Sequence, residues 1–194
     1  MKKGLLIILS GPSGVGKGTV RQEVMKDRSL NLYYSISMTT RPKRAGEVEG
    51  REYYFVSEEE FQKNIDDGNL LEYAQFVGHR YGTPKSKVEE MREHGKNVLL
   101  EIEVNGAAQV MKKYESKDIV SIFLVPPSFK ALEARIRGRS TEGEEVIQAR
   151  LEKARNELAL KEHYKYVVMN DDVFRASNEI KNILHEEIRA EESH

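Results

Sequence analysis

Four short apolar runs divide the chain into segments of strand length. The first, residues 5–9, is an unbroken series of leucine and isoleucine that ends at a glycine-rich turn. The others occupy residues 98–102, 119–125 and 166–169. Runs rich in branched apolar residues are typical of strands that a parallel sheet buries on both faces. The pattern therefore predicts four strands of such a sheet.

Longer stretches between and after these runs show apolar residues at helical spacing. They predict helices at about residues 17–27, 84–95, 105–114, 128–137, 144–162 and 173–191. Because strands and helices alternate along the chain, the expected fold class is α/β, with a parallel sheet core flanked by helices.

Residues 35–82 depart from this alternation and predict an inserted lobe. They are richer in tyrosine, threonine, arginine and glycine, and residues 52–56 alternate as a half-buried strand does. A short helix is expected over residues 57–66, because Ser57 and Glu60 have the spacing of a helix capping box.

A second departure is the polar segment 138–146, which interrupts a helical region. Segments of this kind form mobile flaps, so we expect a small lid over residues 126–150. The remaining residues, 1–34, 83–125 and 151–194, are expected to form the core of a single domain.

Composition narrows the function classes. The chain has 194 residues and no cysteine, which excludes structural disulfides, iron–sulfur clusters and thiolate zinc sites and suits a reducing cytoplasm. The net charge of -1 gives no sign of a nucleic-acid or anionic-membrane partner. The first apolar run is too short for a signal peptide, and no run approaches the length of a membrane helix. We therefore expect a cytoplasmic protein.

A glycine-rich turn follows the first predicted strand and opens the first helix. It consists of Gly11, Pro12, Ser13, Gly14, Val15, Gly16, Lys17, Gly18 and Thr19. The glycines let successive N–H groups point at one oxyanion, and the helix dipole and the lysine add positive charge. The turn therefore predicts a loop that binds the phosphates of a nucleoside triphosphate (a P-loop). A glycine-rich turn without a ligand is the alternative.

One position departs from the usual phosphate-loop pattern, in which a serine or threonine follows the lysine. Here Gly18 stands at that position and Thr19 comes next. The hydroxyl that helps to hold Mg²⁺ is therefore displaced or absent. Thr19 is the candidate metal ligand, directly or through water, and the nucleotide phosphates are expected to supply most of the other ligands.

The phosphate loop alone leaves GTPase, ATPase and kinase open, and further motifs decide between them. Over nearly its whole length the sequence resembles the guanylate kinase family. The resemblance rests on the phosphate loop together with S-x-S-x-T-T-R-x-x-R at 35–44, G-E-V-x-G-x-x-Y at 46–53, L-E-Y-A at 71–74, Y-G-T at 81–83, L-E-I-E-V-x-G at 100–106, V-P-P-S at 125–128, R-x-x-G-R-x-T-E at 135–142 and N-D-D at 170–172.

The resemblance implies that Arg41, Arg44, Tyr53 and Tyr81 grip the phosphate of GMP. Two guanidinium forks and two phenols suit a dianionic phosphate, and lysine could not reproduce the bidentate geometry. A solvated run of charge is the plainer interpretation of an isolated basic cluster.

The resemblance also implies that Ser37, Glu72, Thr83 and Glu103 read the guanine base. An ionised carboxylate such as Glu72 can accept the adjacent N1–H and N2–H₂ donors of guanine, whereas adenine would turn a lone pair toward it. The family often has aspartate where this chain has Glu101 and Glu103. An ordinary surface glutamate is the alternative for Glu72.

Arg135, Arg139 and Arg150 match arginines of the family's lid, which are expected to close over the triphosphate and neutralise charge on the transferred group. A solvated helix face is the alternative for such a row. Asn170 and Asp171 follow the last predicted strand, and the resemblance places them near the adenine.

The implied activity is the phosphotransfer ATP + GMP ⇌ ADP + GDP, with Mg²⁺ as cofactor. Lys17, Arg41 and the lid arginines carry the catalysis, and no general base is needed because the attacking phosphate is already an anion. Two alternatives stay open. The Gly18-Thr19 ending also resembles adenylate kinases, and some related domains are non-catalytic scaffolds that bind phosphopeptides. The oligomeric state is not predicted.

Overall fold

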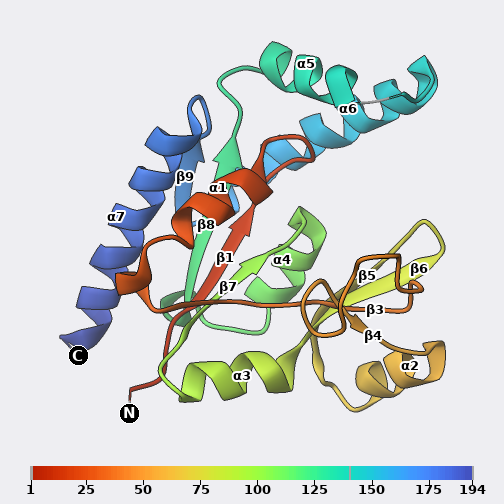
Figure 1. Ribbon diagram of the computed structural model, residues 1–194. Coiled ribbons are helices and arrows are strands. Elements are labelled where there is room, and N and C mark those ends of the chain that lie inside the picture. The colour runs from red at the N-terminus through yellow and green to blue at the C-terminus, as the bar shows by residue number, and fades with distance from the viewer. Residues whose placement is uncertain (1, 140, 194) are drawn as a thin grey trace.

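The computed structural model describes residues 2–139 and 141–193, without the side chains of Ser116, Arg139 and Glu192. Its larger sheet contains five parallel strands in the order β2-β7-β1-β8-β9 (Figure 1). Their bounds are Leu6–Ser10 for β1, Leu32–Tyr34 for β2, Asn97–Glu101 for β7, Ile119–Val125 for β8 and Tyr166–Met169 for β9. The four predicted strands are confirmed within one residue. Strand β2 was not predicted, because its three half-buried residues form no apolar run.

Helices cover both faces of this sheet. The helices of the described residues are Lys17–Val24 for α1, Glu58–Asp66 for α2, Lys85–Glu93 for α3, Val104–Met111 for α4, Phe129–Arg139 for α5, Glu144–Leu158 for α6 and Val173–Glu192 for α7, with short 3₁₀ turns at Arg28–Leu30, Ser116–Asp118 and Ala159–His163. Ile7 and Leu9 pack toward α1 and α7, whereas Leu6 and Ile8 pack toward α3 and α4. This two-sided burial explains the unbroken apolar runs.

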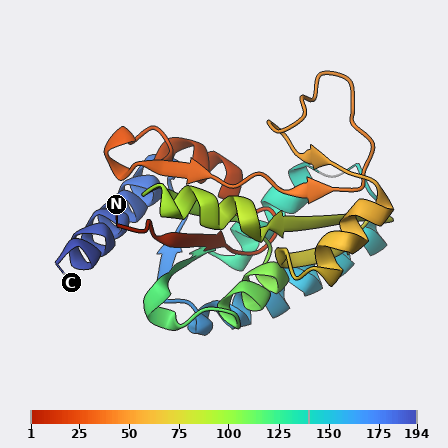
Figure 2. The same cartoon turned by 90° about the horizontal axis from the view of Figure 1, so that it is seen from below.

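Residues between β2 and α3 form a second, smaller sheet in the order β4-β3-β6-β5. Its strands are Met38–Thr39 for β3, Tyr54–Phe55 for β4, Leu70–Phe76 for β5 and His79–Pro84 for β6. The long loop between β3 and β4 projects away from this sheet (Figure 2). The expected strand near 52–56 and the expected helix over 57–66 are both present, and the predicted cap forms, since Ser57 Oγ accepts the N–H of Glu60 at 3.1 Å. The β5–β6 hairpin was not predicted.

A β-bulge lies where the hairpin meets the parallel-sheet core. Leu70 pairs with Pro84 and Tyr73 pairs with Gly82, so that two residues of β5 stand opposite the single residue Thr83. The extra residue lets neighbouring side chains point into different environments. One of the two, Leu71, is fully buried in the core beneath the parallel sheet.

Helices α5 and α6 form a pair that projects from the parallel sheet (Figure 1). Leu132 and Ile136 of α5 pack against Ile147, Leu151 and Ala154 of α6. Helix α5 runs to Arg139 and α6 begins at Glu144, so the break between them is shorter than the predicted polar segment. In the part of the chain that the structure describes, no helix is both long and apolar enough to cross a membrane.

Candidate active site

The glycine-rich loop connects the carboxyl end of β1 with the start of α1. Gly16 adopts φ 96°, a left-handed conformation that a side chain disfavours. A Cβ at Gly16 would lie 2.7 Å from Nδ2 of Asn170, and a Cβ at Gly11 would lie 2.6 Å from the carbonyl oxygen of Leu124. The loop therefore needs glycine both for its backbone conformation and for its close packing.

Two residues from other elements hold the loop at the carbonyl oxygen of Val15. Asn170 Nδ2 donates to this oxygen at 2.8 Å, and Arg135 Nη1 donates to it at 3.1 Å. Arg135 Nη2 also donates to the carbonyl oxygen of Asn170 at 3.3 Å. The sequence predicted Arg135 as a catalytic lid arginine and Asn170 as an ATP-binding residue. The structure adds a supporting role that the sequence did not predict.

The ammonium of Lys17 folds back onto the loop. Its Nζ donates to the carbonyl oxygen of Gly11 at 2.7 Å and to that of Pro12 at 3.4 Å. Burial lowers the pKa of Lys17, and the negative charges of Glu103 and Glu101 oppose that change. A cation that has lost part of its hydration gains stability when an anion arrives beside it.

A cavity of about 370 Å³ opens beside the loop, lined by Ser13, Gly14, Gly16, Lys17, Gly18, Thr19, Glu101, Ile102 and Glu103. One carboxylate oxygen of Glu101, Oε2, accepts from Arg21 Nε at 2.6 Å. The other, Oε1, lies 3.7 Å from where a Cβ of Gly18 would stand.

The oxygen atoms around this cavity fit Mg²⁺, which prefers hard oxygen ligands and keeps several waters or phosphate oxygens of its own. Thr19 contributes an exposed hydroxyl and Glu101 contributes a carboxylate. Within residues 2–139 and 141–193, no group of three or more His, Asp or Glu side chains could hold a metal ion. Mg²⁺ is usually bound through one or two carboxylates together with substrate phosphates.

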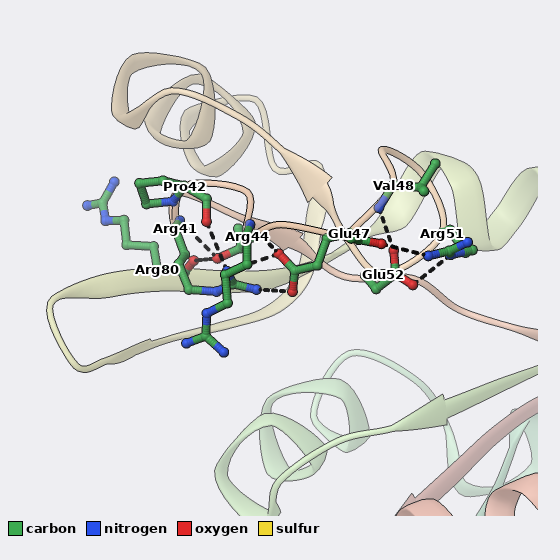
Figure 3. Close-up of polar contacts among 10 residues, drawn as sticks. Arg41, Pro42, Arg44, Glu47, Val48, Arg51, Glu52 and Arg80 are labelled. Atoms are coloured by element: carbon green, nitrogen blue, oxygen red, sulfur yellow. Dashed lines mark hydrogen bonds and ion pairs between the residues drawn. The ribbon is translucent and has the colours of Figure 1, made fainter.

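A basic cluster lies on the loop that follows β3 (Figure 3). The buried guanidinium of Arg41 forks onto the Glu47 carboxylate: Nη2 donates to Oε1 at 2.7 Å, and Nη1 donates to Oε2 at 3.1 Å. The N–H of Arg44 donates to the same Oε2 at 2.8 Å. These hydrogen bonds lower the pKa of Glu47. Glu47 was not predicted as a site residue, although it lies in the G-E-V motif directly after the arginines.

Two tyrosines complete this cluster. The rings of Tyr53 and Tyr81 lie 5.8 Å apart between centroids, and the Arg41 guanidinium lies 5.4 Å from the Tyr53 centroid. The Tyr81 side chain also interacts with that guanidinium. The structure thus brings Arg41, Tyr53 and Tyr81 together, with the exposed Arg44 beside them.

A buried carboxylate lies at the bulge of β5. Glu72 is 7% exposed, and its Oε1 accepts a hydrogen bond of 2.6 Å from the hydroxyl of Thr83, which is 1% exposed. Burial raises the pKa of Glu72, and the Thr83 hydroxyl and the Lys113 ammonium oppose that rise. Ser37 directly precedes β3, which pairs with β6 beside Thr83.

The remaining predicted residues are more exposed. Glu103 stands at the start of α4 and pairs with Lys153 at 3.3 Å. Arg150 pairs with Glu142 at 3.0 Å, and Asp171 pairs with Arg175 at 2.5 Å. The side chain of Arg139 lies outside the described part of the chain.

Comparisons with known proteins agree with this arrangement. The family model described as guanylate kinase matches residues 3–187. Guanylate kinase from Mycoplasma capricolum is 54% identical over 185 residues, which are 95% of this chain and 62% of that protein. Guanylate kinase from Streptococcus thermophilus is 51% identical over 186 residues, which are 96% of this chain and 88% of that protein.

A solved structure matches as well. The crystal structure of guanylate kinase from Anaplasma phagocytophilum superimposes with a TM-score of 0.74 at 35% identity, over 96% of this chain and 87% of that chain. The chain spans somewhat less than two thirds, 62%, of the length of its Mycoplasma relatives. The match nevertheless covers nearly the whole of this sequence, so the chain belongs to the guanylate kinase family.

Proposed function

We propose that this protein transfers the γ-phosphoryl group of ATP to GMP, giving ADP and GDP, as part of purine nucleotide metabolism. One observation carries the proposal. Glu103 lines the phosphate-loop cavity, and its charge acts on both the Lys17 ammonium and the buried Glu72 carboxylate. A triphosphate site and a base-reading site are therefore close neighbours across the two sheets.

The phosphate loop is the donor half of the proposed site. Its amides and Lys17 bind the β- and γ-phosphates, and Arg135 and Asn170 keep the loop in place through Val15. Thr19 and Glu101 would hold Mg²⁺ together with the phosphates of the nucleotide. When bound, the ion would neutralise part of the negative charge of these phosphates. The adenine lies toward Asn170 and Asp171, at the carboxyl end of the sheet.

The second sheet is the acceptor half. The GMP phosphate takes the place of the Glu47 carboxylate on Arg41, since an arginine fork binds either anion with the same geometry. Arg44, Tyr53 and Tyr81 also bind this phosphate. The phosphate oxygen is already a nucleophilic anion, so these residues need only orient it in line with the γ-phosphorus.

The base is read by Glu72 with Thr83, Ser37 and Glu103. The Glu72 carboxylate accepts the N1–H and N2–H₂ groups of guanine. Adenine offers no donor at the first of these positions, so it would leave the buried carboxylate unpaired.

Closure completes the site. We propose that residues 35–82 act as a GMP-binding lobe and residues 126–150 as a lid on the core formed by the rest of the chain. Closing brings Arg139 and Arg150 toward the triphosphate and excludes water, which would otherwise accept the phosphoryl group. The cysteine-free composition favours a cytoplasmic location for this reaction.

The test is ADP production from ATP and Mg²⁺ with GMP, AMP, UMP or no acceptor. The proposal expects turnover that depends on GMP. Turnover with AMP in its place would make the protein an adenylate-type kinase. A folded protein that binds no ATP and turns over none of the acceptors would be a binding module instead.

A further inference from the structure

The outer edge of β5 is held by side chains of the α4 region rather than by another strand. Lys113 Nζ donates to the carbonyl oxygens of Leu70 and Leu71, at 2.8 and 2.7 Å. The carboxamide of Gln109 makes two bonds to one residue: its Oε1 accepts the N–H of Tyr73 at 3.1 Å, and its Nε2 donates to the carbonyl oxygen of Tyr73 at 3.0 Å.

These bonds replace the hydrogen bonds that a neighbouring strand would give to β5. They flank Glu72 on both sides, since they bind the two residues before it and the one after it. This matters because the bulge disrupts the regular ladder with β6 at this point. The backbone that carries Glu72 is therefore fixed largely from the α4 side.

The same face of α4 also makes room for the Glu72 side chain. Gly106 lies three residues before Gln109, so the two share one side of the helix. A Cβ at Gly106 would lie 2.6 Å from Oε2 of Glu72. The Lys113 ammonium in turn favours the charged form of this carboxylate, against the effect of burial.

We propose that Gly106, Gln109 and Lys113, here called the α4 clamp, are positioning residues that set the guanine specificity of the site by fixing the Glu72 carboxylate. This inference rests on the proposed function, in which Glu72 reads guanine. The clamp does not touch the base. It holds the strand, and the strand presents the carboxylate so that both guanine donors reach it together.

The experiment compares Lys113→Met and Gln109→Met with two matched controls, Lys112→Met and Asn105→Met, in the full chain. Both control residues are exposed and lie on the same segment. Dissociation constants are measured by calorimetry for GMP, for inosine monophosphate, which lacks the 2-amino group, and for ATP. Melting temperatures are measured in parallel.

Each clamp variant is expected to weaken GMP binding about 10-fold, which corresponds to the loss of one well-placed hydrogen bond to a charged group. The preference for GMP over inosine monophosphate should fall with it, because a misplaced carboxylate no longer reaches the 2-amino group. ATP binding should stay within about 2-fold of wild type. Lys113→Arg, which keeps donors for both carbonyls, should restore most of the preference.

Clamp variants that melt at lower temperature yet keep the wild-type preference would overturn the proposal, since the contacts would then be structural only. Equal effects in clamp and control variants would overturn it as well. Gln109→Met decides the question if Lys113→Met does not fold, because the two side chains bind different backbone groups. A wild-type protein with no preference for GMP would instead contradict the proposed role of Glu72, and the clamp proposal would fall with it.

Discussion

The two halves of the candidate site are constructed by different means. The phosphate loop is mainly backbone, set on a strand buried on both faces, and Val15 anchors it in the largest apolar core. The acceptor half is made of side chains that other side chains hold, as Glu47 holds Arg41 and Thr83 holds Glu72. Its own apolar core is small, with Met38, Phe61 and Leu70 as the buried residues.

Because they are held differently, the two halves are vulnerable to different substitutions. A loop whose shape is fixed by backbone conformation should fail through glycine or lysine changes. A site fixed by polar pairs should fail through changes of hydrogen bonding or protonation, with little loss of fold. Under the proposed function, the acceptor half also exchanges one of its pairs, Arg41 with Glu47, for the incoming phosphate.

The largest effect is expected at the loop. Lys17→Ala should lower kcat/KM by about 10³-fold, because the proposed function places this ammonium on the transferred phosphate, where it stabilises charge that develops in the transition state. The melting temperature should change little, since the hydrogen bonds of Lys17 to described residues go to carbonyls of its own loop. Steady-state kinetics with circular dichroism measure both quantities.

The control is Lys26→Ala, which removes an exposed lysine that follows α1 and pairs with Glu23. It should keep wild-type turnover. A folded Lys17→Ala protein with near-normal activity would remove the phosphate loop from the mechanism.

A smaller effect is expected from Glu72→Gln. The amide keeps the shape but cannot accept from both guanine donors, so KM for GMP should rise by about 10- to 100-fold while KM for ATP stays unchanged. Burial raises the pKa of Glu72, so the folded state binds this proton more tightly than the unfolded chain does. The ionised carboxylate therefore lowers the free energy of unfolding at neutral pH, and the glutamine variant should melt no lower than wild type.

The same pKa shift gives a pH prediction. Because the pKa of Glu72 is raised, its carboxylate takes up a proton at a higher pH than an ordinary glutamate does. KM for GMP should therefore increase as the pH falls through this range, and Glu72→Gln should lack that limb of the profile. A limb that persists in the variant would assign the titration to another group.

Local patterns were sufficient to predict the donor half. The strand 5–9, the glycines and Lys17 are contiguous, so spacing alone predicts the strand, the loop and the helix, while the chemistry of the loop stays a prediction. The helix cap at Ser57 was predictable for the same reason. Strand β2 was not, because only three half-buried residues of it join the sheet and its register comes from β7.

The acceptor half was predicted as a set of residues, by resemblance, but not as a structure. The bulge at Glu72 depends on how β5 pairs with β6, and no local periodicity of apolar and polar residues encodes that pairing. The bonds from Gln109 to Tyr73 join residues 36 positions apart. Glu47 lies near Arg41 in sequence, yet the sequence pattern does not show which of the nearby arginines Glu47 pairs with.

Two glycines of the same loop give a paired prediction of moderate size. Gly16→Ala places a Cβ at φ 96° and 2.7 Å from Asn170 Nδ2, so it should lower the free energy of unfolding by about 2 kcal/mol and weaken ATP binding. Gly18→Ala lies within α1 and meets Glu101 Oε1 at 3.7 Å, an ordinary contact. It should be neutral or stabilising by about 0.5 kcal/mol. Urea unfolding measures both, and equal effects would contradict the backbone argument.

The smallest effect is expected at the far end of the acceptor half, in the two-residue turn of the β5–β6 hairpin. Val77 adopts φ 48° there and is 78% exposed, followed by Gly78 at φ 75°. A β-branched residue is strained in this conformation, and asparagine before glycine is the preferred pair in such turns. Val77→Asn should raise the free energy of unfolding by about 1 kcal/mol and leave turnover unchanged. Val146→Asn, the same change at an exposed helical position, should not stabilise. If both variants unfold at the wild-type urea concentration, the turn stores no strain.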